Sequence, residues 1–117
     1  MIALTIDCEE WNSPALRGRS DFDNGNTSFS RLGNEQLLKL LKKHDIHCTF
    51  FVTGYFAEQE PESVKEIIAH GHEIASHGYE HHYRKRVFDV ENDVRKSKEI
   101  LEKITGKNVI GFRAPQV

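Results

Sequence analysis

Residues 48–81 of the chain read CTFFVTGYFAEQEPESVKEIIAHGHEIASHGYEH. The apolar runs at 48–53 and 73–76 each predict a short β-strand. Between them, Pro61 suits the first turn of a helix, and Gly71 suits its end. The apolar residues spaced to face inward from this helix are Val64, Ile67 and Ile68. Strand, helix and strand in this order are typical of a parallel α/β fold.

The same alternation continues on both sides of this stretch. A strand is predicted at 2–8, and a polar loop at 12–30 separates it from a helix for which Asn34 is the expected cap. Asp89 is the expected cap of a longer helix, and a fourth strand is predicted at 109–112. The inward faces expected of these two helices consist of Leu37, Leu40 and Leu41 in the first and Val90, Val94, Ser97, Leu101 and Ile104 in the second. The predicted fold class is α/β, built from parallel β/α units.

Composition and length restrict the class of protein. The 117 residues suit a single domain, residues 1–117, and the formal net charge of −2 gives no reason to expect nucleic acid as a partner. No apolar run approaches the roughly 20 residues that span a bilayer, and no signal-peptide pattern follows Met1. Cys8 and Cys48 form no CxxC pair and indicate no disulfide framework. These features predict a cytoplasmic protein.

Polar residues gather where the predicted strands end. In parallel α/β folds the loops at the carboxyl ends of the strands converge, and active sites are built there. Six polar residues lie at or just after these ends: Asp7, Glu9, Thr53, His77, His81 and Arg113. The sequence therefore predicts a functional site at this edge of the sheet.

Two histidines of this set have a metal-ligand spacing. His77 and His81 are four residues apart, so a helical turn could direct both imidazoles to one metal ion. The alternative is a histidine-rich surface loop. A metalloprotease motif is excluded, because His72 and Glu73 are not followed by a histidine at the required spacing.

Asp7 and Glu9 supply carboxylates to the same site. Alternate residues of a strand point to one face, so both could enter a pocket while Cys8 turns away; the alternative is a solvated strand end. Two histidines and one carboxylate commonly hold a divalent metal, and a second carboxylate could act as general base. Arg113 could orient such a carboxylate by a bidentate contact, or could be a surface arginine before a turn proline.

Three stretches carry a family resemblance: TIDCE at 5–9, GHEIASHGYEH at 71–81 and GFRAP at 111–115. Together, and in this order, they resemble the motifs of the polysaccharide deacetylase family, also called the nodulation-type deacetylase domain or carbohydrate esterase family 4. The strand at 49–52 is also similar to the family's second strand. The resemblance implies a distorted (β/α) barrel, of which this chain would form about half.

The resemblance also implies roles for individual residues. These are metal ligation by His77 and His81, general-base catalysis by Asp7, and orientation of that base by Arg113. The common first motif of the family has two adjacent aspartates and a glycine, whereas this chain is more similar to an Asp-x-Glu branch. That branch implies Glu9, rather than Cys8, as the third ligand. One divalent metal is expected, with zinc as first choice and with cobalt, nickel or manganese also fitting the ligands.

The activity implied is that of a metal-dependent hydrolase that cleaves linear C–N amide bonds and removes acetyl groups from amino sugars of a glycan. Trp11 lies beside the predicted site and could stack on a sugar ring or pack in the core, and Pro115 is also expected to contact substrate. The substrate remains open among exopolysaccharide, peptidoglycan, chitooligosaccharide and cyclic amides.

The later motifs of the family, including the histidine that protonates the leaving amine, have no counterpart in this sequence. The chain alone is therefore expected to bind metal with little or no turnover. An open sheet edge would favour a homo-oligomer or a complementing chain. The alternatives are a non-catalytic glycan- or metal-binding module and a half-barrel subunit that a partner chain completes.

Overall fold

The computed structural model describes residues 1–9, 27–80 and 87–115, with the backbone alone described at 87–89. Its elements follow in the order β1 (Thr5–Cys8), α2 (Ser28–Lys43), β2 (Thr49–Val52), α3 (Gly54–Gln59), α4 (Pro61–Ala69), β3 (Glu73–Ser76) and α5 (Val87–Thr105). The strands pair in parallel in the order β1-β2-β3. The predicted α/β fold with parallel strands is confirmed.

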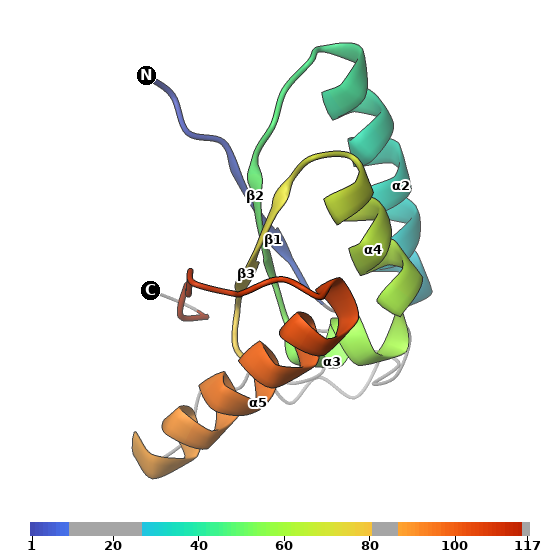
Figure 1. The fold of residues 1–117 in the computed structure, drawn as a ribbon. Helices are drawn as coiled ribbons and strands as arrows, with labels where there is room; N and C mark the ends of the chain where they lie inside the picture. The colour runs from blue at the N-terminus through green and yellow to red at the C-terminus, as the bar shows by residue number, and fades with distance from the viewer. Residues whose placement is uncertain (10–26, 81–86, 116–117) are drawn as a thin grey trace.

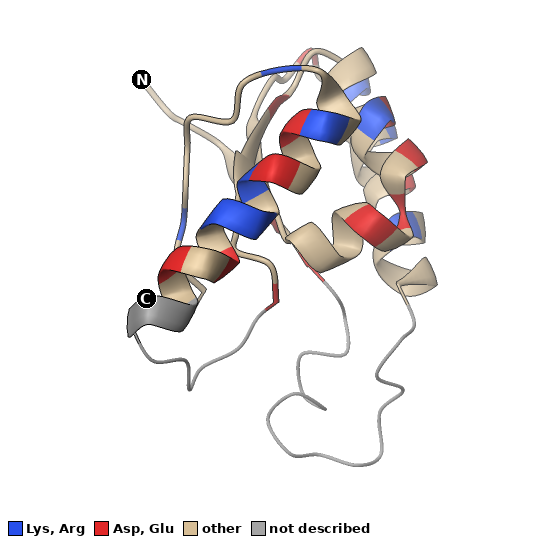
Figure 2. Ribbon diagram, turned by 60° about the horizontal axis from the view of Figure 1, so that its bottom comes forward, with Lys and Arg blue, Asp and Glu red and all other residues tan. Residues whose placement is uncertain are grey.

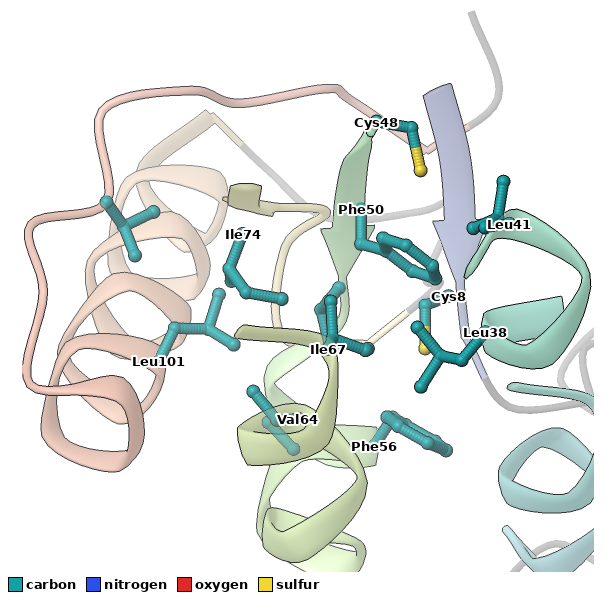
Figure 3. Packing of buried hydrophobic residues seen from close by; sticks show 13 residues of the cluster. Cys8, Leu38, Leu41, Cys48, Phe50, Phe56, Val64, Ile67, Ile74 and Leu101 are labelled. Atoms are coloured by element: carbon teal, nitrogen blue, oxygen red, sulfur yellow. The ribbon is translucent and has the colours of Figure 1, made fainter. Parts of the chain in front are cut away.

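The helices pack on one face of this sheet. Helices α2 and α4 lie side by side along it, the short α3 follows the end of β2, and α5 crosses beyond β3 (Figure 1). Apolar side chains from the strands and the helices pack together between the sheet and the helices (Figure 3). The buried hydrophobic residues are Cys8, Leu38, Leu41, Cys48, Phe50, Val52, Phe56, Ala57, Val64, Ile67, Ile74, Leu101 and Val109.

The core fixes which strand residues face which way. Phe50 and Val52 are fully buried between the sheet and the helices, and full burial of such a side chain stabilises the fold by about 1.5–3 kcal/mol. Because strand residues alternate, Phe51 points to the opposite face, where it is the register partner of Asp7 on β1 and of Ala75 on β3. This second face carries the polar residues of β1.

The fourth strand predicted at 109–112 is wrong in extent. One parallel bridge joins Phe112 to Ser76, supported by two backbone hydrogen bonds between β3 and the returning chain. The backbone N–H of Val109 is instead bonded to the Glu102 carboxylate of α5 at 2.9 Å. The start of the segment at 109–112 is therefore bonded to α5, and only its end pairs with the sheet.

The helix starts also differ from prediction. Helix α2 begins at Ser28, not after Asn34, and α5 begins at Val87, before the predicted cap at Asp89. The inward face of α2 changes accordingly: Leu38 is buried, whereas Leu40 is 52% exposed. Asn34 was expected to be a cap, but it is buried inside the helix and bonded to β1. A tertiary hydrogen bond therefore explains why this polar residue is buried within the helix.

Charged residues of both signs follow one another along α5 in short acidic and basic blocks (Figure 2). Two pairs one helical turn apart account for part of this pattern, Arg95 with Glu91 at 2.6 Å and Lys98 with Glu102 at 3.7 Å. Within the described residues, no helix combines the length and the apolar character that a bilayer crossing requires.

Candidate functional site

The end of β1 presents two carboxylates on one side of the sheet. Cys8 is 3% exposed and points into the core. The side chains of its two neighbours in sequence therefore project from the opposite face of the sheet. The side chains of Asp7 and Glu9 are 42% and 28% exposed, respectively. The geometry removes the Cys8 thiol from the site and leaves both carboxylates in it.

His77 follows β3 and lies across from Glu9. Its imidazole is almost completely buried, and the distance from Nε2 to Oε2 of Glu9 is 3.6 Å. On the other side of the ring, Nδ1 donates a hydrogen bond to the main-chain oxygen of Arg113 at 2.8 Å. Because a carbonyl oxygen can only accept, Nδ1 holds the proton, and Nε2 of the neutral ring presents its lone pair toward Glu9.

The surroundings of His77 act on its pKa in opposite directions. Burial, the largest single effect, lowers the pKa, whereas the Glu9 contact and the Arg113 carbonyl raise it. The charge of Asp7 also raises it, and the pKa of His77 lies above its usual 6.5 as a result. The imidazole is thus in an anionic environment, which is also favourable for a bound cation.

Arg113 connects the last segment of the chain to β1. Its guanidinium donates to Oδ1 of Asp7 at 2.6 Å and to Oγ1 of Thr5 at 2.8 Å. The same group lies 4.1 Å from the centre of the Phe51 ring. The arginine therefore crosses the face of the sheet over β2, and the contact proposed from sequence between Arg113 and Asp7 is present in the structure.

The loop after His77 is tied down on both sides. Backbone N–H groups of Gly54 and Tyr55 donate to the carbonyls of Gly78 and Tyr79, both at 2.9 Å. From α5, the Asp93 carboxylate accepts from the backbone N–H of Tyr79 at 2.8 Å. Sequence reasoning missed Asp93, since an acidic residue among the charges of α5 looks like part of a solvated surface.

The remaining predicted residues have different outcomes. His81 and Trp11 lie outside the described residues. Pro115 lies beside the His77 loop, because a Cβ atom built on Gly78 would be 3.8 Å from its Cγ. Thr53 contributes a helix cap, with its hydroxyl accepting from a backbone N–H of α3. The structure thus brings together the side chains of Asp7, Glu9, His77 and Arg113.

Glu9 and His77 fit two positions of one metal site. In the described part of the chain, no three His, Cys, Asp or Glu side chains are grouped so as to hold a metal ion. Two ligands on a tetrahedral zinc ion, with bonds of about 2.1 Å, are about 3.4 Å apart, close to the 3.6 Å between Nε2 and Oε2. The hydrogen bond at Nδ1 is the usual second contact of a metal-binding histidine.

A hollow of about 400 Å³ lies at the opposite end of the strands. It is lined in part by His47, His70 and His72. Nδ1 of His72 accepts from the backbone N–H of Cys48 at 3.3 Å, so this ring is engaged in holding the start of β2. The carboxyl ends of the strands remain the better candidate site.

Comparison with known proteins identifies the family. A family model described as polysaccharide deacetylase matches residues 20–117. The chain therefore belongs to the polysaccharide deacetylase family, as the sequence motifs indicate. It is 36% identical to a peptidoglycan deacetylase of Helicobacter pylori over 86 residues, which cover 72% of this chain and 29% of that protein.

Solved structures of the family have the same fold. The match to PdaA of Bacillus subtilis, a family 4 carbohydrate esterase, has a TM-score of 0.69 at 29% identity and covers 97% of this chain and 42% of that one. A CE4 family pseudoenzyme from Bacillus anthracis matches with a TM-score of 0.71 at 26% identity, over 98% of this chain and 35% of that one. The chain spans between 22% and 38% of the length of the first curated relatives that it matches.

Proposed function

We propose that this chain carries the metal-binding and proton-accepting part of a hydrolase that removes acetyl groups from N-acetylated amino sugars of a glycan. The observation that carries the proposal is the pairing at neighbouring strand ends: Asp7 is bonded to Arg113, and Glu9 faces His77. A general base beside a metal ligand is an arrangement that supports metal-assisted hydrolysis of an amide. Family membership supports the same chemistry.

The proposed ligands of one divalent metal are Glu9, His77 and His81, with zinc as first choice. A bound metal would supply Lewis-acid polarisation of the amide carbonyl and make water a stronger nucleophile at neutral pH. Asp7 would accept the proton of the attacking water as the water oxygen bonds to the acyl carbon and the carbonyl π bond opens. When the C–N bond then breaks, the carbonyl re-forms and the leaving amine takes a proton, which protonated Asp7 or solvent would supply. Arg113 holds the Asp7 carboxylate in place through the contact at 2.6 Å.

The names of the relatives support the proposed substrate class. Their names include peptidoglycan deacetylases and chitooligosaccharide deacetylases, and the shared chemical group is the acetamide of an amino sugar. Trp11 and Pro115 are the residues proposed to contact the sugar. We infer an N-acetylated glycan as substrate and leave the particular polymer to the assay.

Metal binding is the direct test of the site. Zinc titration of metal-free protein, with a competing chelator, should give one tight site, and His77→Ala should abolish it. Ser63→Ala is the matched control for general damage, because Ser63 is buried in α4 and is not part of the site. A His77→Ala protein that binds zinc as tightly as the parent would show that the ligand set is wrong.

Acetate release from acetylated chitooligosaccharides and from peptidoglycan then tests turnover. A second candidate function is a glycan- or metal-binding module without turnover, and it is favoured by the likeness to the CE4 family pseudoenzyme. Zinc-loaded protein that binds acetylated glycan but releases no acetate would support the binding module. Acetate release that depends on Asp7 would support the hydrolase.

A further inference from the structure

The first turns of α2 hold the end of β1 by two side chains. Oγ of Ser30 donates to the main-chain oxygen of Glu9 at 2.7 Å, and Nδ2 of Asn34 donates to Sγ of Cys8 at 3.0 Å. Ser30 and Asn34 are one helical turn apart and share a face of α2. One helix face therefore contacts two consecutive residues where β1 ends.

The Ser30 contact lies just beyond the last residue of β1 that pairs with β2. The last register pair of β1 joins Cys8 to Val52, and the carbonyl of Cys8 accepts from the backbone N–H of Thr53 at 3.1 Å. Glu9 lies one residue past this last pair. Its main-chain oxygen is therefore held by α2, and this contact restrains the position of the Glu9 backbone from which the side chain projects.

The position of Ser30 is itself fixed by contacts of the same helix end. Oγ1 of Thr27, the residue before α2, donates to Oε1 of Glu60 at 2.8 Å. Arg31 lies 3.4 Å from the other oxygen of the Glu60 carboxylate. Glu60 stands between α3 and α4, so the start of α2 is anchored to a separate part of the fold.

We infer that Ser30 is a positioning residue for Glu9, and that its hydrogen bond sets the affinity of the metal site. The inference rests on the proposed function, in which Glu9 is a ligand. Ser30 acts on the main chain, and through it keeps the Glu9 carboxylate 3.6 Å from Nε2 of His77. Contacts that orient a ligand from behind typically change metal affinity by about 10–100-fold, and we expect about 10-fold for this one.

The test compares zinc affinities of variants of the 117-residue chain by chelator competition. Ser30→Ala should bind zinc about 10-fold more weakly than the parent. Ser63→Ala, the same change at a buried serine of α4, should bind like the parent. Circular dichroism and chemical unfolding of each variant show whether a loss of affinity reflects a loss of folded protein.

A second pair of variants isolates the hydroxyl group. Ser30→Thr and Ser30→Val have side chains of nearly the same shape, and only the first retains a donor for Glu9. The threonine variant should bind zinc more tightly than the valine variant. Equal affinities in this pair, or parent-like binding by Ser30→Ala, would overturn the inference alone. A parent protein that binds no zinc would overturn the proposed function and the inference with it.

Discussion

Replacement of Arg113 by methionine should separate the role of its side chain from that of its main chain. Methionine removes the guanidinium and keeps an unbranched stem of similar length. The hydrogen bonds to Asp7 and Thr5, at 2.6 and 2.8 Å, and the contact with the Phe51 ring would all be lost. The carbonyl that accepts from Nδ1 of His77 would remain, because every residue supplies one.

The magnitude follows from how exposed these contacts are. The Arg113 and Asp7 side chains are 36% and 42% exposed, and an ion pair in such a setting contributes about 0–1 kcal/mol. The hydrogen bond that the charged guanidinium donates to the Thr5 hydroxyl lies at the exposed surface and adds about 1 kcal/mol, and an exposed cation–π contact such as that with Phe51 adds about 0.5–1 kcal/mol. Arg113→Met should therefore lower the free energy of unfolding by about 2 kcal/mol.

The assay is urea unfolding followed by circular dichroism, together with zinc titration. Arg95→Met is the matched control: Arg95 pairs with Glu91 at 2.6 Å, but both side chains are more than half exposed, so about 0.5 kcal/mol or less is expected. The zinc affinity of Arg113→Met should stay close to that of the parent. Unchanged unfolding would mean that the contacts around the guanidinium contribute nothing. Loss of zinc would mean that the side chain, not the carbonyl, orients His77.

Three further changes have defined outcomes. Asp7→Asn should retain zinc in titrations and, in glycan acetate-release assays, lower any turnover by about 10²–10⁴-fold; loss of zinc would instead make Asp7 a ligand. Gly54→Ala should lower the unfolding free energy by about 1–3 kcal/mol, because its Cβ would lie 2.8 Å from Cδ2 of Tyr79. Gly33→Ala, with nothing within 4 Å, is the control and should not destabilise. Burial, with the charge of two neighbouring histidines, lowers the pKa of His72 below its usual 6.5. The unfolded chain therefore takes up this proton first as the pH falls, and the stability advantage of the parent over His72→Gln should shrink as the pH falls through the usual histidine pKa of 6.5 toward the lowered pKa of the folded state; an advantage that grew would contradict this.

Much of the sheet could be predicted because its strands are buried on the helix side and end in recognisable residues. The apolar run at Thr49–Val52 and the short run at Glu73–Ser76 are strands as predicted. Helix α3 was missed, because its six residues are too few to show a helical period after the cap at Thr53. A four-residue strand was predicted at 109–112, whereas the structure has a single bridge at Phe112. The sequence cannot show that the Glu102 carboxylate accepts a hydrogen bond from the backbone N–H of Val109.

The residues of the candidate site that lie at strand ends could be predicted from the sequence. The residues that hold them in place from other parts of the chain could not. Alternation along β1 predicts that Asp7 and Glu9 share a face. The contact of Arg113 with Asp7 was implied by the family resemblance and not by the strand order, which places the bridge at Phe112 beside β3 rather than beside β1. The hydrogen bond from Ser30 to Glu9 spans 21 residues, and no local pattern marks a serine in a helix as its donor. Supporting contacts of this kind depend on tertiary packing.

The two carboxylates of β1 are neighbours on one face, yet different parts of the chain hold them. Asp7 is held by the Arg113 side chain, which reaches it across the sheet, whereas the main chain of Glu9 is held by Ser30 from α2. These two contacts share no atoms and can be removed by separate substitutions, although the main-chain carbonyl of Arg113 also contacts His77, which faces Glu9. The proposed proton acceptor and the proposed metal ligand can therefore be lost separately. If the proposed roles hold, this separation gives a physical route from a hydrolase to a binding module, since loss of the Asp7 carboxylate alone would remove the proposed proton acceptor and leave the proposed metal ligands in place.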